Sequence, residues 1–88
     1  MNSIQVILTI DTENLPADFQ EMLKEEQEVV AGWRKEGILD HLFLRQGRNG
    51  AVLIFKDVSE ERARELMETL PFFKIKKSIE YHSLIKQF

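Results

Sequence analysis

Hydrophobic and polar residues alternate at the start of the chain, which predicts a β-strand over residues 3–10. The apolar side chains at every second position share one face, and they are Ile4, Val6, Leu8 and Ile10. The other face carries Ser3, Gln5, Ile7 and Thr9, which is a mixed rather than a polar set. The sequence therefore predicts a strand with one fully apolar face and one mixed face.

Two later stretches show the spacing of amphipathic helices. The first is predicted over residues 16–35, with Pro16 at its first position and Gly37 as its stop signal. Its apolar positions are Phe19, Met22, Leu23, Val29, Val30 and Trp33. The second begins after a cap at Asp57 or Ser59 and ends before Pro71. Its stripe is Ala63, Leu66, Met67 and Leu70.

Three further extended segments complete the pattern. Strands are predicted over residues 38–45 and 51–56, and the Asn49-Gly50 pair between them is typical of a hairpin turn. In the first of these strands, alternation places Leu39, His41, Phe43 and Arg45 on one face. A long last strand is predicted over residues 72–85, where Phe73, Ile75, Ile79, Tyr81 and Ile85 share a face.

The resulting order is β-α-β-β-α-β, which indicates one α+β domain of the ferredoxin-like class over residues 1–88. Right-handed crossovers place both helices on one face of a four-stranded antiparallel sheet. The other face then carries apolar residues such as Ile7 and Phe43 that no helix covers. Small domains gain stability from disulfides, metals or oligomerisation, and this chain of 88 residues has no cysteine. We therefore expect a homodimer or larger homo-oligomer that pairs sheet to sheet.

Composition narrows the function. The net charge is −3 and the charges are interspersed, so nucleic acid is not expected as a partner. No apolar run approaches the roughly 20 residues that cross a bilayer, and no signal peptide is evident, so a cytoplasmic protein without membrane association is expected. No phosphate-binding loop, nucleophile motif or metal-ligand cluster is present, and no cofactor or metal is expected. An enzyme of this kind would perform cofactor-free proton transfer.

Glu26 is the clearest candidate for such chemistry. At about 100° per residue it falls within the apolar stripe of the first helix, near Leu23 and Val30. Desolvation there would raise the pKa of its carboxyl group, as a general base working near neutral pH requires. The alternative is a structural role, in which Glu26 pairs with a nearby cation.

A second group of candidates lies on the strand predicted at 38–45. His41 could transfer a proton, Arg45 could bind an anionic substrate, and Phe43 could form an apolar wall. Trp33, on the helix, is a further candidate for the wall of a pocket. The alternatives are an interface histidine, a solvated arginine and a core tryptophan.

Several short motifs resemble the muconolactone delta-isomerase family over residues 15–86. They are Gly37 with His41-Leu42, Gly47 in the hairpin, Phe55 with Val58-Ser59, and Leu70-Pro71-Phe72-Phe73 with Ile79-Glu80. The resemblance implies a ferredoxin-like subunit in a dimeric α/β barrel and a proton shift in a carboxylate-bearing unsaturated lactone. It places Glu26 and His41 where similar residues occur in the family.

The chain departs from the family pattern in the second strand. The resemblance leads us to expect an arginine at position 44, where this chain has Leu44 followed by Arg45. A shift of one residue points a side chain to the opposite face of a sheet. Ile38 also replaces an expected aromatic residue. Two alternatives to an isomerase therefore stay open: a non-catalytic binding or assembly module, and a cofactor-independent monooxygenase with a cavity around Trp33, His41 and Phe43.

Overall fold

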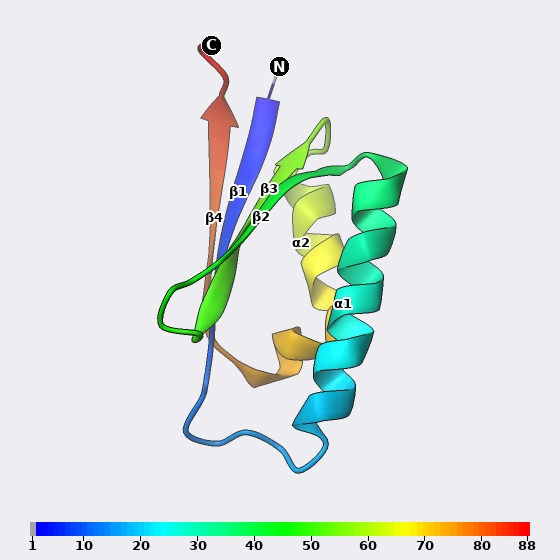
Figure 1. Ribbon diagram of the computed structural model, residues 1–88. Helices are drawn as coiled ribbons and strands as arrows, with labels where there is room; N and C mark the ends of the chain where they lie inside the picture. Colours follow the sequence, from blue (N-terminus) through cyan, green and yellow to red (C-terminus); the bar gives the residue numbers. More distant parts are fainter. Residues whose placement is uncertain (1) are drawn as a thin grey trace.

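The computed structural model describes residues 2–88 and has the βαββαβ order that the sequence predicts. Four strands form one antiparallel sheet in the order β2-β3-β1-β4, and both helices cover the same face of it (Figure 1). The elements are β1 (Asn2–Ile10), α1 (Phe19–Glu36), β2 (Leu39–Leu44), β3 (Gly50–Lys56), α2 (Glu60–Glu68), the short 3₁₀ helix η1 (Pro71–Ile75) and β4 (Lys76–Ile85).

The core lies between the helices and the central strands. The register places Ile4 beside Phe55 and Val6 beside Leu53, so the apolar face of β1 continues onto β3. The predicted apolar faces of β1 and of both helices are confirmed. The buried side chains are Ile4, Val6, Leu8, Ile10, Trp33, Leu39, Leu53, Phe55, Ala63, Leu66, Met67 and Leu70.

Helix α1 differs from the prediction at its start. It begins at Phe19, because residues 16–18 form a turn in which the Pro16 carbonyl accepts a hydrogen bond from the Phe19 N–H at 3.1 Å. It ends as predicted at Gly37, which has φ = 82° and whose N–H donates to the Arg34 carbonyl at 3.1 Å. A left-handed residue is common after the last turn of a helix, and glycine adopts that conformation without steric cost.

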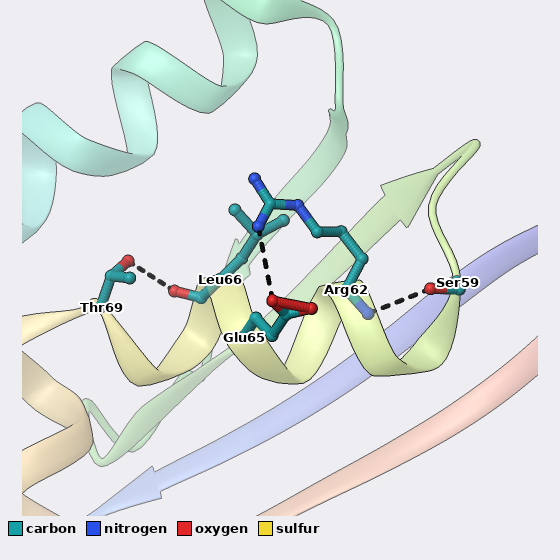
Figure 2. Close-up of polar contacts among 5 residues, drawn as sticks. All are labelled: Ser59, Arg62, Glu65, Leu66 and Thr69. Atoms are coloured by element: carbon teal, nitrogen blue, oxygen red, sulfur yellow. Dashed lines mark hydrogen bonds and ion pairs between the residues drawn. The ribbon is translucent and has the colours of Figure 1, made fainter.

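Helix α2 is fixed by side-chain contacts at both ends, as Figure 2 shows. Ser59, one of the two predicted caps, accepts a hydrogen bond from the Arg62 N–H at 3.0 Å. At the other end the Thr69 hydroxyl donates to the Leu66 carbonyl at 2.6 Å. The first bond gives a partner to an N–H of the first turn, and the second adds to the bond that the Thr69 N–H already makes with the Leu66 carbonyl at 3.0 Å.

The sequence did not predict three backbone irregularities, one of which is a register shift between Thr9 and Ile10 in the pairing of β1 with β4. The register of β2 on β3 shifts between Leu39 and His41, so Asp40 occupies a bulge. The bulge turns Leu39 toward the helices beside Phe55, although simple alternation had placed it with His41. Residues Pro71–Ile75, partly included in the predicted last strand, form η1 instead, and β4 begins only at Lys76.

The face of the sheet away from the helices is open (Figure 1). It mixes apolar, polar and charged side chains, and Phe43 is 57% exposed there. The residues that the register assigns to this outer face are Ser3, Gln5, Ile7, Thr9, His41, Phe43, Val52, Ile54, Lys56, Ser78, Glu80, His82 and Leu84. None of the helices formed by residues 2–88 is long and apolar enough to cross a membrane.

Candidate active site

A cleft of about 1100 Å³ lies between α1 and the sheet, on the side of the edge strand β2. Its apolar walls come from three directions: Leu23 and Val30 on α1, Leu8 and Leu53 on the central strands, and Leu42 on β2. The volume is that of a small-molecule site, and apolar walls with a few polar groups are the usual composition of one. The cleft therefore qualifies as a candidate active site.

Glu26 is the carboxylate that α1 contributes to this cleft. Its side chain is half-buried, and its Oε1 accepts a hydrogen bond from the Phe72 N–H at 3.1 Å. Burial raises the pKa of Glu26 to about 7, and the Phe72 N–H opposes that rise without cancelling it. Near neutral pH the carboxyl group is therefore divided between its acid and base forms, as a group that takes up and returns a proton requires.

Two aromatic rings form the end of the cleft nearest to this hydrogen bond. Phe19 and Phe72 stack with ring centroids 5.4 Å apart and planes 8° from parallel, and both line the cleft. Phe19 is the first residue of α1, and Phe72 follows Pro71 in η1. The 3₁₀ helix thus supplies both the N–H donor to Glu26 and part of the apolar surface that keeps water from it.

His41 and Phe43 lie on the other side of the sheet from Glu26. The register pairs His41 with Ile54 and Phe43 with Val52, which directs both side chains to the outer face. Their rings stack at a centroid distance of 5.9 Å, and the His41 Nε2 lies 3.5 Å from a carboxylate oxygen of Asp40. His41 contributes to the rim of the cleft along β2, whereas Phe43 is not among its lining residues.

Arg45 contacts both the cleft and the outer face of the sheet. It lines the cleft where β2 leads into the hairpin. Its Nη1, however, donates a hydrogen bond of 2.7 Å to the Thr9 hydroxyl on the outer face. The two side chains meet across Gly50, which separates their strands and has no side chain. Glu26, His41 and Arg45 thus surround one cleft, but only Glu26 projects from the helix side.

Trp33 belongs to the core. It is buried against Phe55 at a ring-centroid distance of 5.4 Å and does not line the cleft. The monooxygenase alternative had required a cavity around Trp33, Phe43 and His41, and of these three only His41 borders the cleft. This geometry gives that alternative no support.

Sequence reasoning did not identify Arg34 and Arg48 as site residues. Both line the cleft, Arg34 from the last turn of α1 and Arg48 from the β2–β3 hairpin. Among residues 2–88, neither has a carboxylate oxygen within 4.0 Å. The sequence gives no distinctive signal for either residue, because exposed arginines are common in the last turn of a helix and in hairpins.

The charges of the cleft are therefore unbalanced. Arg34, Arg45 and Arg48 face two carboxylates, of which Asp40 is shared with His41 and with Lys56 at 4.0 Å. The second carboxylate, Glu26, is partly protonated near neutral pH. An excess of guanidinium groups around an apolar cleft favours a small anionic ligand. In the part of the chain described, no three His, Cys, Asp or Glu side chains are grouped as metal ligands.

Comparison with solved structures identifies proteins of the same fold. A crystal structure of muconolactone isomerase superposes with a TM-score of 0.80 and 23% sequence identity, covering 97% of this chain and 90% of that one. The 5-chloro-2-hydroxyhydroquinone dehydrochlorinase of Burkholderia phenoliruptrix AC1100, in complex with 2,5-dihydroxybenzoquinone, gives a TM-score of 0.61 at 15% identity. It covers 90% of each chain. No model of a protein family matches this sequence, and no curated protein matches it either. The resemblance noted in the sequence is thus confirmed at the level of structure: this chain has the fold of muconolactone isomerase.

Proposed function

We propose that this protein is a cofactor-free isomerase that shifts a proton within a small anionic unsaturated lactone or a related metabolite. The observation that carries the proposal is the position of Glu26, half-buried at the apolar cleft with its pKa raised to about 7. A base of that pKa is well matched to proton transfer near neutral pH.

In the proposed reaction the ionised Glu26 takes a proton from a carbon next to an unsaturated, electron-withdrawing group. The same carboxyl group then returns the proton to the far end of the conjugated system, so the double bond moves and the enzyme is unchanged. The Phe72 N–H holds Oε1, and among residues 2–88 no hydrogen bond occupies the other carboxylate oxygen. That second oxygen is the atom that would carry the proton.

His41 was predicted as a second proton-transfer group. Its imidazole would have to reach around the edge strand β2 to meet a substrate beside Glu26, because its side chain is directed to the outer face. Glu26 alone can perform both steps, since it gives back the proton it takes. The proposal therefore assigns both transfers to Glu26. The fold supports the assignment, because it is also the fold of a muconolactone isomerase.

The test uses muconolactone in D₂O, followed by proton NMR. The unmutated chain should exchange and move a carbon-bound proton, while Glu26→Gln should be slower by about 10²- to 10⁴-fold, the contribution of a positioned general base. The matched control is Glu28→Gln, because Glu28 is exposed on the same helix and does not line the cleft. Equal rates for the unmutated chain and Glu26→Gln would refute the assignment.

The same fold also favours self-association. We propose that the outer face of the sheet pairs with the outer face of a second copy. Ile7, Phe43, Val52 and Ile54 form an apolar strip there that no helix covers. Burying such a strip is favourable in proportion to its area, and symmetric pairing buries both copies at once. This assembly role is compatible with catalysis, because the cleft lies on the helix side.

A further inference from the structure

The position expected for a cleft-facing arginine on β2 is occupied by Leu44. Leu44 pairs with Ala51 on the helix side of the sheet, lines the cleft and is 80% exposed. The arginine that follows it, Arg45, is turned by the alternation of the strand toward Thr9. A guanidinium nitrogen that already donates to Thr9 is directed away from a ligand beside Glu26.

Arg48 occupies the better position for an anion. It belongs to the hairpin between β2 and β3 and lines the same cleft as Glu26. Its backbone has φ = 57°, and its N–H donates to the Arg45 carbonyl at 2.9 Å, so the turn holds the residue at the edge of the cleft. Its guanidinium group makes no hydrogen bond or ion pair with another side chain among residues 2–88.

Arg34 also lines the cleft and has no ion-pair partner among residues 2–88, but it lies toward the other end of α1 from Phe19. It belongs to the last turn of α1, where a positive charge also stabilises the helix dipole. Glu26 is instead bonded to η1, which contacts the first half of the helix through the Phe19–Phe72 stack. Of the two, Arg48 is therefore the cation placed to hold a ligand whose reacting carbon lies at Glu26.

We infer that Arg48 is the specificity-determining residue of the cleft and that it binds the carboxylate of a small organic acid whose apolar part lies between α1 and β2. The inference rests on the proposed function, because it takes Glu26 as the reacting group. A guanidinium group can donate two parallel hydrogen bonds to a carboxylate, which discriminates against a neutral ester.

The experiment measures binding separately from turnover. In a Glu26→Gln background, muconolactone and its methyl ester are titrated while backbone amide resonances of the cleft are followed by NMR. We expect the acid to bind at least about tenfold more tightly than the ester, which is the scale of one hydrogen bond between charged groups. Arg48→Gln should abolish that preference, and Arg48→Lys should restore part of it. Arg62→Gln, an exposed change on α2 that leaves the cleft intact, is the matched control.

Three results would overturn the inference. They are an acid preference that survives Arg48→Gln in a chain whose circular dichroism is unchanged, a larger loss of preference in Arg45→Gln than in Arg48→Gln, and cleft resonances that respond to neither compound. Turnover is measured with Glu26 intact. An Arg48-dependent preference for the acid without isomerisation would refute the proposed isomerase while supporting Arg48 as the carboxylate site.

Discussion

The backbone N–H of Phe72 and the carboxylate of Glu26, 46 residues apart in sequence, form a hydrogen bond of 3.1 Å. The bond stabilises the ionised carboxylate, whereas the burial that surrounds it stabilises the neutral acid. Burial has the larger effect, and the pKa settles at about 7. Helix α1 and the 3₁₀ helix η1 thus set the proton affinity of the group together, and that affinity has measurable consequences.

The first consequence is a dependence of stability on pH. In the folded chain burial raises the pKa of Glu26 to about 7, above the ordinary value of 4.5 for a solvated glutamate. Between those two pH values the folded state binds more protons than the unfolded state, so the contribution of Glu26 to stability falls as the pH rises through that window. The loss should stay below about 3.5 kcal/mol, the product of the rise from 4.5 to about 7 and about 1.4 kcal/mol per pKa unit, because the side chain is partly exposed to water.

Urea unfolding at pH 4.5 and at pH 8 measures this term. Glu26→Gln should remove the Glu26 contribution to the difference in unfolding free energy between the two pH values, because an amide does not titrate in this range. Glu28→Gln should show the same difference as the unmutated chain. The comparison isolates Glu26 from the other carboxylates, which are common to all three proteins. If the unfolding free energies of the unmutated chain and of Glu26→Gln depended on pH in the same way, the carboxyl group of Glu26 would be solvated in the folded chain.

The aromatic end of the cleft provides the second prediction. Phe72→Ala keeps the N–H donor but removes the ring that stacks on Phe19. Water should then reach the carboxylate, so the pKa of Glu26 should fall from about 7 toward 4.5. A carbon-13 NMR titration of the glutamate carboxyl groups would follow it. Phe73→Ala is the matched change, because the ring of Phe73 contacts Lys76 at 4.8 Å and does not line the cleft.

Two glycines should respond oppositely to the same substitution. A Cβ at Gly50 would collide with the carbonyl oxygen of Leu8, whereas one at Gly32 would meet no atom within 4 Å. Gly50→Ala should therefore destabilise the chain by at least about 2 kcal/mol, because the backbones of β1 and β3 would have to separate. Gly32→Ala should stabilise it by about 0.5–1 kcal/mol, since it lies inside α1. Midpoints of urea unfolding would report both, and a tolerated Gly50→Ala would contradict this register.

Periodicity was sufficient to predict the fold. Burial of one face produces the alternation in β1 and the apolar stripes of the helices, which contain Val30 and Leu66. The sequence pattern therefore reports directly which face of each element is buried. The same reasoning identified Glu26, because a carboxylate within an apolar stripe interrupts the pattern. It could not identify Phe72 as the partner of Glu26, because that contact is made by a backbone N–H that every residue except proline has.

The sequence placed His41 and Phe43 on the same face of β2, as the structure does, but it placed Leu39 on that face wrongly for a local reason. The bulge at Asp40 changes which residues of β2 face the helices, and period-two alternation cannot locate an extra residue. Alternation predicted the face to which Arg45 points, but it could not predict the hydrogen bond to Thr9, which lies on a strand far away in sequence. Arg48 resembles any exposed hairpin residue until the position of α1 is known.

The outer face of the sheet provides the last prediction. Ile54 lies in the middle of that face, beside Gln5 on β1 and His41 on β2, and away from the core. Ile54→Glu should leave the fold of one chain intact but place a charge at the centre of the proposed interface. Burying an unpaired carboxylate is costly, so the variant should sediment as a monomer at concentrations where the unmutated chain is a dimer or larger. Leu15→Glu, on the exposed loop before α1, makes the same chemical change outside that face and should leave the assembly unaltered. A monomeric unmutated chain at micromolar concentration would contradict the proposed pairing, because the apolar strip of Ile7, Phe43, Val52 and Ile54 would then stay uncovered.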